Sequence, residues 1–201
     1  MALFGGQRRI PCVSYPLKRL VDVVGSSIAL VLLAPAFVLI AIAVKLDSKG
    51  PILFRQQRLG LGEHPFTILK FRSMRVDAAR LGPAFTEGDD PRITRVGRVL
   101  RKTSLDELPQ MLNVLRGEMS LIGPRPFAGF ELQIASDEQR ASRASVRPGI
   151  SGLAQTSGRS SLTPEQTLEL DLEYAAQCGL IFDFALLCRT VIAASRLRQI
   201  N

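Results

Sequence analysis

The longest apolar run of the chain lies near its N-terminus, and basic residues flank it on both sides: Lys18, Arg19, Lys45 and Lys49. Residues 23–44 carry no charged side chain. As one helix, this run would span about 33 Å, close to the thickness of a hydrocarbon core. Pro35 lies past its middle, and a proline removes one backbone hydrogen bond from a helix. The pattern predicts a membrane anchor that breaks or kinks at Pro35.

Three interpretations of this run compete. A signal peptide fits poorly, because residues 37–44 stay apolar beyond the Ala34-Pro35-Ala36 triplet that resembles a cleavage site. A kinked helix that spans the bilayer is allowed, because prolines are tolerated in membrane helices. Basic residues favour the cytoplasmic side of a membrane, so basic flanks at both ends favour a re-entrant helix that returns to the side from which it started.

After Gly50-Pro51, the pattern predicts a compact, mainly helical region with short strands. Extended segments are expected at 52–54 and 66–71, around a glycine-punctuated turn at 59–62. Helices are expected at 74–81, from 96 onward, and at 108–115, 129–145, 164–177 and 181–198. Loops are expected at 82–91, 123–126 and 147–159. The last helix either lies on a membrane surface through Phe182, Leu186 and Leu187 or packs in the core.

Composition restricts the chemistry that the chain can perform. Its 201 residues include 26 Lys and Arg against 18 Asp and Glu, a net charge of +8, which indicates anionic partners. Nucleic acid is not expected, because aromatic residues do not interleave with the basic ones and a long apolar run has no place in such a protein. The only histidine is His64, and the spacing of the three cysteines matches neither a zinc site nor a disulfide framework. Any metal is therefore expected to be Mg²⁺ held by carboxylates and phosphates.

Two adjacent acids, Asp106 and Glu107, are the first candidates for catalysis. Ser104 and Glu107 have the spacing of a helix capping box, which is the purely structural interpretation. Pro109 would then fall inside the first turns of that helix, where its ring is costly. The helix could instead begin near Leu108 and leave both acids at its N-terminal end.

Basic residues surround these acids in the sequence: Arg92, Arg95, Arg98, Arg101, Lys102, Arg116 and Arg125. They could form a solvated or lipid-facing surface, or a clamp for a diphosphate, which suits the guanidinium fork of arginine. Two Gly/Pro-rich loops, residues 123–126 and 147–158, each place an arginine beside a backbone that can turn sharply and bind anions.

In sequence order, these motifs resemble the bacterial sugar transferase family, the monotopic phosphoglycosyl transferases, from about Lys18 to the C-terminus. The resemblance rests on nine motifs: Lys18-Arg19-x-x-Asp22, Pro35, Gly50-Pro51-Ile52-Leu53-Phe54-x-Gln56, Lys70-Phe71-Arg72-Ser73-Met74, Asp89 to Gly97, Arg101 to Gln110, Asn113 to Ser120, Gly123-Pro124-Arg125-Pro126 and Arg147 to Gly152.

The resemblance implies transfer of a sugar phosphate from a UDP-sugar to a polyprenol phosphate, with release of UMP. Asp106 would be the nucleophile, forming a covalent phosphosugar intermediate, and Glu107 would complete the catalytic dyad. Mg²⁺ would assist, with Asp106 as a ligand. Substrate contacts are expected from seven residues: Lys70, Arg72, Arg101, Arg125, Arg147, Gln155 and Arg159.

The expected fold is mainly α with short β pieces, combining a re-entrant membrane helix-break-helix, a compact cytoplasmic catalytic head and surface amphipathic helices. The expected parts are a basic segment at 1–22, a re-entrant helix at 23–46 broken at Pro35, and a catalytic domain at 47–201. The site of action would be the cytoplasmic face of a bacterial inner membrane, in glycan or exopolysaccharide biosynthesis. Whether the chain forms a homodimer is left open.

The chain departs from the family pattern at three places, where Ala34 stands for a serine, Leu153 for a tryptophan, and Thr156 to Arg159 for a Val-Asn-Gly-Arg sequence. The last two lie in a loop expected to touch nucleotide or sugar, so they affect the prediction of which sugar is transferred more than the prediction of the reaction class. Two other functions remain alternatives: a non-catalytic basic adaptor that binds anionic lipid or nucleic acid, and a hydrolase that uses the same acids with water.

Overall fold

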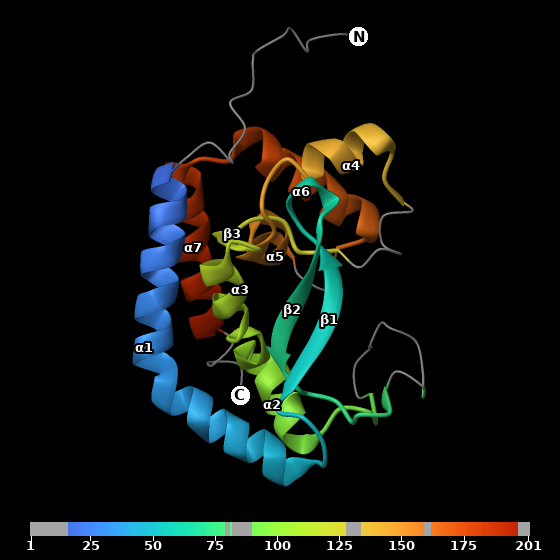
Figure 1. Ribbon diagram of the computed structural model, residues 1–201. Coiled ribbons are helices and arrows are strands. Elements are labelled where there is room, and N and C mark those ends of the chain that lie inside the picture. Colours follow the sequence, from blue (N-terminus) through green and yellow to red (C-terminus); the bar gives the residue numbers. More distant parts are fainter. Residues whose placement is uncertain (1–15, 79–80, 82–89, 128–133, 159–161, 197–201) are drawn as a thin grey trace, which may run out of the picture.

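The computed structural model describes all residues except 1–15, 79–80, 82–89, 128–133, 159–161 and 197–201 (Figure 1). The described part is mainly helical with few short strands, which confirms the predicted fold class at this level. Its elements, in chain order, are α1 (Pro16–Asp47), β1 (Leu53–Leu59), the 3₁₀ turn η2 (Leu61–Glu63), β2 (Pro65–Phe71), α2 (Arg95–Thr103), the 3₁₀ turn η4 (Leu105–Glu107), α3 (Gln110–Arg116), β3 (Ser120–Ile122), α4 (Asp137–Arg143), β4 (Gly149–Ser151), α5 (Leu153–Ser157), α6 (Pro164–Gln177) and α7 (Leu180–Arg196).

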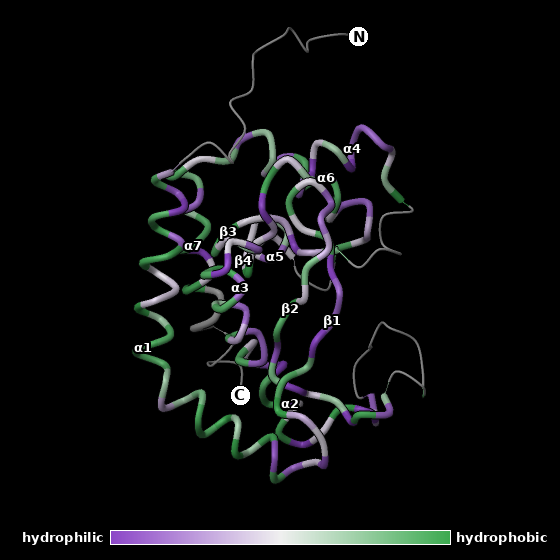
Figure 2. The backbone as a smooth tube through the Cα atoms, in the orientation of Figure 1, coloured by the Kyte–Doolittle hydropathy of each residue, from purple (hydrophilic) through white to green (hydrophobic). Residues whose placement is uncertain are grey.

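The apolar run near the N-terminus forms one long helix, α1, of 32 residues. The helix continues through Pro35 without interruption, so the proline does not break the secondary structure, but Figure 1 shows that the two halves of α1 lie at an angle. Most of α1 is hydrophobic (Figure 2), and only 6% of its most apolar 18-residue window is buried. By length and composition, α1 is the one helix of the described residues that could cross a membrane.

Both ends of α1 are attached to the rest of the protein. At the first turns, the Arg19 guanidinium donates to the carbonyls of Val114 and Leu115 at the end of α3. Near the last turn, Val44 is buried beside Phe71 and Leu100.

Charged residues complete both attachments. Lys18 pairs with Asp183 of α7, and the buried Asp22 accepts hydrogen bonds from the Ser120 hydroxyl and the Leu121 N–H, both at 3.0 Å. At the other end, the Asp47 carboxylate accepts from the Val96 N–H at 2.9 Å, in the first turn of α2. The motif Lys18-Arg19-x-x-Asp22 therefore docks α1 onto β3, α3 and α7.

Strands β1 and β2 form an antiparallel hairpin, with Leu53 opposite Phe71 and Leu59 opposite Pro65. Figure 2 shows that β1 is largely hydrophilic, whereas four side chains of β2 are buried in the core: Phe66, Ile68, Leu69 and Phe71. This difference makes β2 the strand against which α3 packs.

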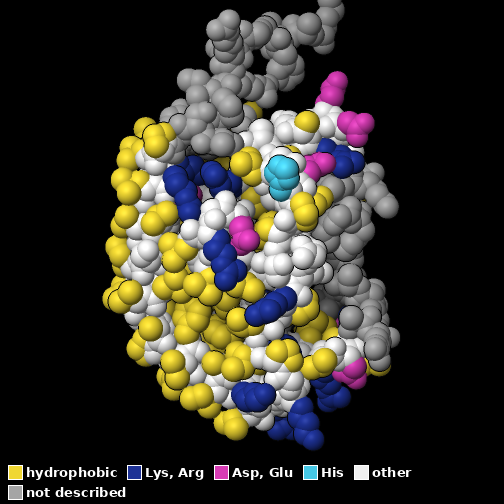
Figure 3. Space-filling model, viewed as in Figure 1, with side chains coloured by type: hydrophobic (Ala, Val, Ile, Leu, Met, Phe, Trp, Pro, Cys, Tyr) yellow, Lys and Arg dark blue, Asp and Glu magenta, His cyan; other side chains and the backbone are white. Residues whose placement is uncertain are grey.

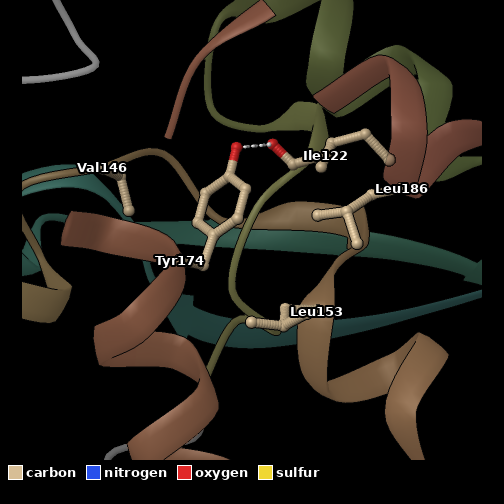
Figure 4. Close-up of a cluster of buried hydrophobic side chains, with 5 residues drawn as sticks. All are labelled: Ile122, Val146, Leu153, Tyr174 and Leu186. Carbon is tan, nitrogen blue, oxygen red and sulfur yellow. Dashed lines mark hydrogen bonds between the residues drawn. The ribbon is translucent and has the colours of Figure 1, made fainter. Parts of the chain in front are cut away.

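A second core lies around β3 and β4, which pair in parallel. Figure 4 shows its five buried side chains, Ile122, Val146, Leu153, Tyr174 and Leu186, from β3, the segment before β4, α5, α6 and α7. The Tyr174 hydroxyl donates to the Ile122 carbonyl at 3.0 Å. Burial with a satisfied hydroxyl is the usual environment of a core tyrosine.

Several predicted elements are confirmed. The helix expected at 164–177 is α6, whose bounds match and whose Pro164 lies in the first turn. The two extended segments form the hairpin, the helix expected at 108–115 is α3, and the last helix is α7. Gly117, with φ of 84°, ends α3.

Other predictions were wrong. The loop expected at 147–159 contains β4 and α5, because residues 149–151 pair with a strand distant in sequence. Residues 74–78 form a bridge and a turn, not a helix. Of the helix expected at 129–145, residues 129–133 lie outside the described residues, and α4 covers Asp137–Arg143. The predicted loop at 82–91 lies almost entirely outside the described residues.

For α7, the structure agrees with core packing, one of the two predicted alternatives, at Phe182 and Leu186. Leu186 is fully buried and Phe182 stacks on Tyr174, with ring centroids 6.0 Å apart, so both belong to the core. Ile181 and Phe184 are exposed instead, at 89% and 68%.

Candidate active site

The two adjacent acids lie in the tight connection between α2 and α3. Ser104 ends α2 in the left-handed conformation, with φ of 57°, and its side chain caps no helix. The chain then makes the single 3₁₀ turn η4, and α3 starts at Gln110, directly after Pro109. The capping-box interpretation was therefore wrong. The alternative, a helix that begins near Leu108 and leaves both acids before it, is two residues from the observed start at Gln110. Pro109 lies directly before this start, where its missing N–H costs no helical hydrogen bond.

The surroundings of Asp106 and Glu107 give these neighbours different electrostatics. Lys70, near the end of β2, donates from Nζ to Glu107 Oε1 at 2.6 Å. Burial, followed by the negative charge of Glu107, raises the pKa of Asp106 to about 6, while the charges of Lys70 and Arg101 act in the opposite direction. Four predicted site residues, Lys70, Arg101, Asp106 and Glu107, thus form one group.

A buried asparagine holds this group together. Asn113 of α3 is fully buried, and its amide pairs with the edge of β2. Oδ1 accepts from the Leu69 N–H at 3.1 Å, and Nδ2 donates to the Thr67 carbonyl at 2.7 Å. The side-chain amide thus replaces the peptide of a neighbouring strand. This contact fixes α3 against β2 and brings Lys70 to Glu107.

The acids also lie beside the apolar helix α1. Leu105 and Leu108, on either side of the dyad, pack against the cluster of Val44, Phe71 and Leu100. Phe37, Ile40 and Ala41 of α1 pack against the same cluster. The space-filling view shows hydrophobic side chains along the outer edge of α1 and over the face beside it (Figure 3). The exposed large ones on α1 are Leu17, Leu20, Val21, Val24, Ile28, Val31, Leu32, Val38, Leu39, Ile42 and Leu46.

The two Gly/Pro-rich loops are packed against each other through glycines. A Cβ on Gly123 would lie 2.3 Å from the Arg147 carbonyl, and one on Gly152 would lie 2.1 Å from the Gly123 carbonyl. No side chain fits at these contacts, so the backbones touch. The loops form a second group, in which Arg125 is exposed to solvent.

The other predicted contact residues lie in different parts of the structure and differ in their exposure. Arg72 is only 4% exposed, and its guanidinium donates to the carbonyls of Ser48 and Lys49 beyond the end of α1. A contact between Arg72 and substrate therefore stays a prediction. Arg147 is half-buried and donates from Nε to the Gly117 carbonyl at 2.9 Å. It therefore lies at the opposite end of α3 from the dyad, about 10 Å away along the helix.

Gln155 and Arg159 belong to the segment that follows β4. Gln155 Oε1 is buried without a hydrogen-bond partner in the described part of the chain, and it approaches the Gly152 position. Arg159 lies outside the described residues.

The dyad offers carboxylate oxygens, the donors that Mg²⁺ prefers. Among the described residues, no group of three or more Asp, Glu, His or Cys side chains could hold a metal alone. Mg²⁺ commonly uses one or two protein carboxylates and takes its remaining ligands from water and substrate phosphates. Burial and the neighbouring charge of Glu107 disfavour the ionised form of Asp106, and a cation bound there would favour it, so the residues present fit this ion.

Sequence reasoning missed the roles of several residues that build the site, above all Asn113. A polar amide among apolar positions on the buried side of a short helix was the available signal. The partner on β2 could not be read from the sequence, because it lies 44 and 46 residues away.

Comparison with known proteins gives a consistent result. A family model described as "Bacterial sugar transferase" matches residues 13–196. The chain is 45% identical over 181 residues to a Caulobacter vibrioides protein named "UDP-glucose:undecaprenyl-phosphate glucose-1-phosphate transferase", covering 87% of this chain and 68% of the relative. It is 42% identical over 187 residues to an Escherichia coli K12 protein with the same name, covering 87% and 39%.

A shorter relative matches over almost its full length. The "Exopolysaccharide production protein PSS" of Rhizobium leguminosarum is 40% identical over 188 residues, which is 88% of this chain and 94% of the relative. The chain therefore spans about two thirds of the Caulobacter protein, about two fifths of the E. coli protein and nearly all of the Rhizobium protein.

Proposed function

Because the chain belongs to the bacterial sugar transferase family and is thus a transferase, we propose that it moves a sugar 1-phosphate from a UDP-sugar to undecaprenyl phosphate and releases UMP. The observation that carries this proposal is the Asp106–Glu107 dyad, held between two cations and beside the apolar helix α1. The names of the relatives support undecaprenyl phosphate as acceptor. An Aeromonas hydrophila relative, 39% identical, is named for N-acetylgalactosamine phosphate transfer, so the sugar differs among relatives.

In the first step, an Asp106 carboxylate oxygen attacks the β-phosphorus of the UDP-sugar. The bond from this phosphorus to the bridging oxygen breaks, UMP leaves with that oxygen, and the sugar phosphate remains on Asp106. The attack requires an ionised carboxylate. With its pKa raised to about 6, Asp106 is mostly ionised at pH 7 and more basic than an ordinary aspartate.

In the second step, a phosphate oxygen of the lipid attacks the same phosphorus, and the Asp106 carboxylate is released. The product is a polyprenol diphosphate sugar, and no proton is gained or lost in the balance. Dividing the transfer into two steps means that the two bulky substrates need not react with each other directly. Lys70 fixes Glu107 beside the nucleophile, where Glu107 could act as a base toward the lipid phosphate or orient the metal.

Asp106, with Glu107 beside it, would hold Mg²⁺, which when bound supplies positive charge to the diphosphate. Arg101 and Lys70 add positive charge from the protein itself. Arg125 is proposed to contact the diphosphate from the rigid loop after β3.

We further propose that α1 is re-entrant and that the head lies on the cytoplasmic face of the membrane. A straight helix of 32 residues would be about 48 Å long and would separate its ends by a whole bilayer. Both ends of α1 instead contact the same head, through Arg19 and Asp22 at one end and Val44 and Asp47 at the other. This attachment supports a helix that enters and leaves the membrane on one side, with the dyad near the head-group level.

The test is UMP release from a panel of UDP-sugars by the purified protein in nanodiscs, with undecaprenyl phosphate and Mg²⁺. We expect release with at least one UDP-sugar and loss of release in Asp106→Ala. Asp137→Asn, which removes an exposed carboxylate on α4, is the matched control and should retain activity. Absence of UMP release from every donor, or full activity of Asp106→Ala, would refute the proposal.

The products separate the remaining alternatives. A hydrolase would yield free sugar phosphate in place of a lipid-linked product. A non-catalytic adaptor would bind anionic vesicles in a salt-dependent manner, with no role for either acid.

A further inference from the structure

The loop after β3 is held at every carbonyl from Pro124 to Phe127. Its donors come from four positions: Gly149 N to Pro124 at 2.8 Å, Arg143 Nη2 to Arg125, Arg58 Nη1 to Pro126 at 3.2 Å and Leu59 N to Phe127 at 3.1 Å. Four consecutive carbonyls satisfied by other parts of the chain are unusual in a loop, where water normally satisfies many of them.

Arg125 is the one exposed residue of this loop. Gly123, Pro124, Pro126 and Phe127 are all buried. The loop therefore has a fixed backbone and presents a single side chain, a guanidinium, to solvent.

Arg143 of α4 makes the contact that acts on Arg125 itself. It is 8% exposed and donates from Nη2 to the Arg125 carbonyl. Its guanidinium also lies over the Phe127 ring, 3.5 Å from the centroid. One buried side chain thus contacts the Arg125 backbone before Pro126 and the Phe127 ring after it.

Asp171 of α6 orients Arg143. Its carboxylate is 1% exposed and accepts from Arg143 Nε at 2.9 Å. Burial raises the pKa of Asp171 to about 6, and the charges of Arg143 and Arg125 act in the opposite direction. The series Asp171, Arg143, Arg125 therefore runs from the core to the surface.

We propose that Arg143, oriented by Asp171, is a positioning residue that holds Arg125 for binding the diphosphate of the nucleotide sugar. This inference rests on the proposed function, because it takes Arg125 as a substrate contact. A guanidinium binds phosphate through a directional fork, and a preformed backbone lowers the cost of ordering it on binding.

The test measures equilibrium binding of UDP with Mg²⁺ to the full chain in nanodiscs, so it does not depend on turnover. Arg125→Gln should weaken UDP binding about 10-fold or more. Arg143→Met combined with Asp171→Leu removes the buried ion pair as a unit, a replacement that proteins often tolerate. This double variant should keep its melting temperature and weaken UDP binding to a similar degree.

The decisive comparison is the combination of all three substitutions. If Arg143 acts through Arg125, adding Arg125→Gln to the double variant should weaken UDP binding by less than about 3-fold further. Arg140→Met is the matched control, because Arg140 lies on the same helix and pairs with Glu63 at the hairpin tip instead. It should leave UDP binding unchanged.

Three results would overturn the inference. They are unchanged UDP binding in Arg125→Gln, unchanged UDP binding in a folded double variant, and a triple variant whose loss of UDP affinity equals the product of the losses in Arg125→Gln and in the double variant. If the double variant unfolds, Arg143→Lys replaces it, since a single ammonium can keep the pair with Asp171 but lacks the fork. Wild-type UDP binding by Arg143→Lys would also overturn the inference. A protein that binds UDP with this pattern but releases no UMP would refute only the proposed function.

Discussion

At the scale of single residues, the site gives two neighbouring carboxylates different surroundings. Glu107 has an ammonium partner at 2.6 Å, whereas Asp106 is more strongly affected by burial and by the charge of Glu107. Pairs of acids whose surroundings differ in this way commonly divide the roles of a reaction between them. Here the raised pKa of Asp106 also has a consequence for stability.

We expect Asp106→Asn to be more stable than the wild type at pH 7 when Mg²⁺ is removed with EDTA. The folded-state pKa of Asp106 is about 6, against 3.8 for the unfolded chain. Between these values the folded state binds more protons, so the stability that Asp106 contributes falls as pH rises from about 4 to about 6 and stays low above that. The Asn variant lacks this titration.

Melting temperatures measured in detergent between pH 4 and 8 check this expectation. The difference between variant and wild type should grow with pH and level off above about 6. Asp137→Asn, in which the carboxylate is fully exposed, controls for the loss of one charge. Identical pH profiles for the wild type and Asp106→Asn would contradict the argument.

At the scale of elements, the position of α3 decides the geometry of the site. The helix starts just after the dyad, and its Asn113 side chain forms hydrogen bonds with the edge of β2. The carbonyls at its C-terminal end accept hydrogen bonds from Arg19 and Arg147. A seven-residue helix has little stability of its own, so these contacts hold it in place.

We expect Asn113→Leu to destabilise the protein by about 2 kcal/mol or more, because it leaves the Leu69 N–H and the Thr67 carbonyl buried and unpaired. For a chain of this size, this corresponds to a melting temperature lower by roughly 4–8 °C. Gln57→Leu, on the outer strand of the same hairpin, is the control and should change the melting temperature little. An unchanged melting temperature for Asn113→Leu would show that the amide contacts contribute nothing.

Elements with a local signal could be predicted from the sequence, and elements with a distant partner could not. The bounds of α6 followed from Pro164 and an amphipathic pattern. The parallel pairing of β3 with β4 could not be read, because each strand has only three residues and its partner lies almost 30 residues away. Asp106 and Glu107 stay the predicted catalytic pair, whereas the burial of Arg72 could not be predicted, because its charge gave no sign of it.

At the scale of the whole molecule, α1 is both the apolar surface of the protein and part of its framework. Its exposed side chains form an apolar face of the kind that marks a contact with a membrane or another protein. Its two ends carry the polar contacts that join it to the head. In the proposed topology, the same helix that packs beside the dyad would therefore fix the position of the head over the bilayer.

We expect a protease-cleavable tag at the N-terminus to be cut in inside-out membrane vesicles and protected in intact spheroplasts. A re-entrant α1 leaves the N-terminus and the head on the cytoplasmic side. The same tag at the C-terminus is the control and should behave identically. Cutting of the N-terminal tag alone from outside the cell would mean that α1 spans the membrane.

The contact between Lys18 and Asp183 has a consequence for how the protein is made. The two residues are 165 positions apart, so at a synthesis rate of about 5–20 residues per second the helix waits roughly 8–33 s for its partner. During this interval α1 has left the ribosome, but the docking site on α7 does not yet exist. The partners of α1 on α3 and β3 lie only 95 to 99 positions further along the chain, so these contacts can form first, and α1 is secured at α7 only after nearly the whole chain has been translated.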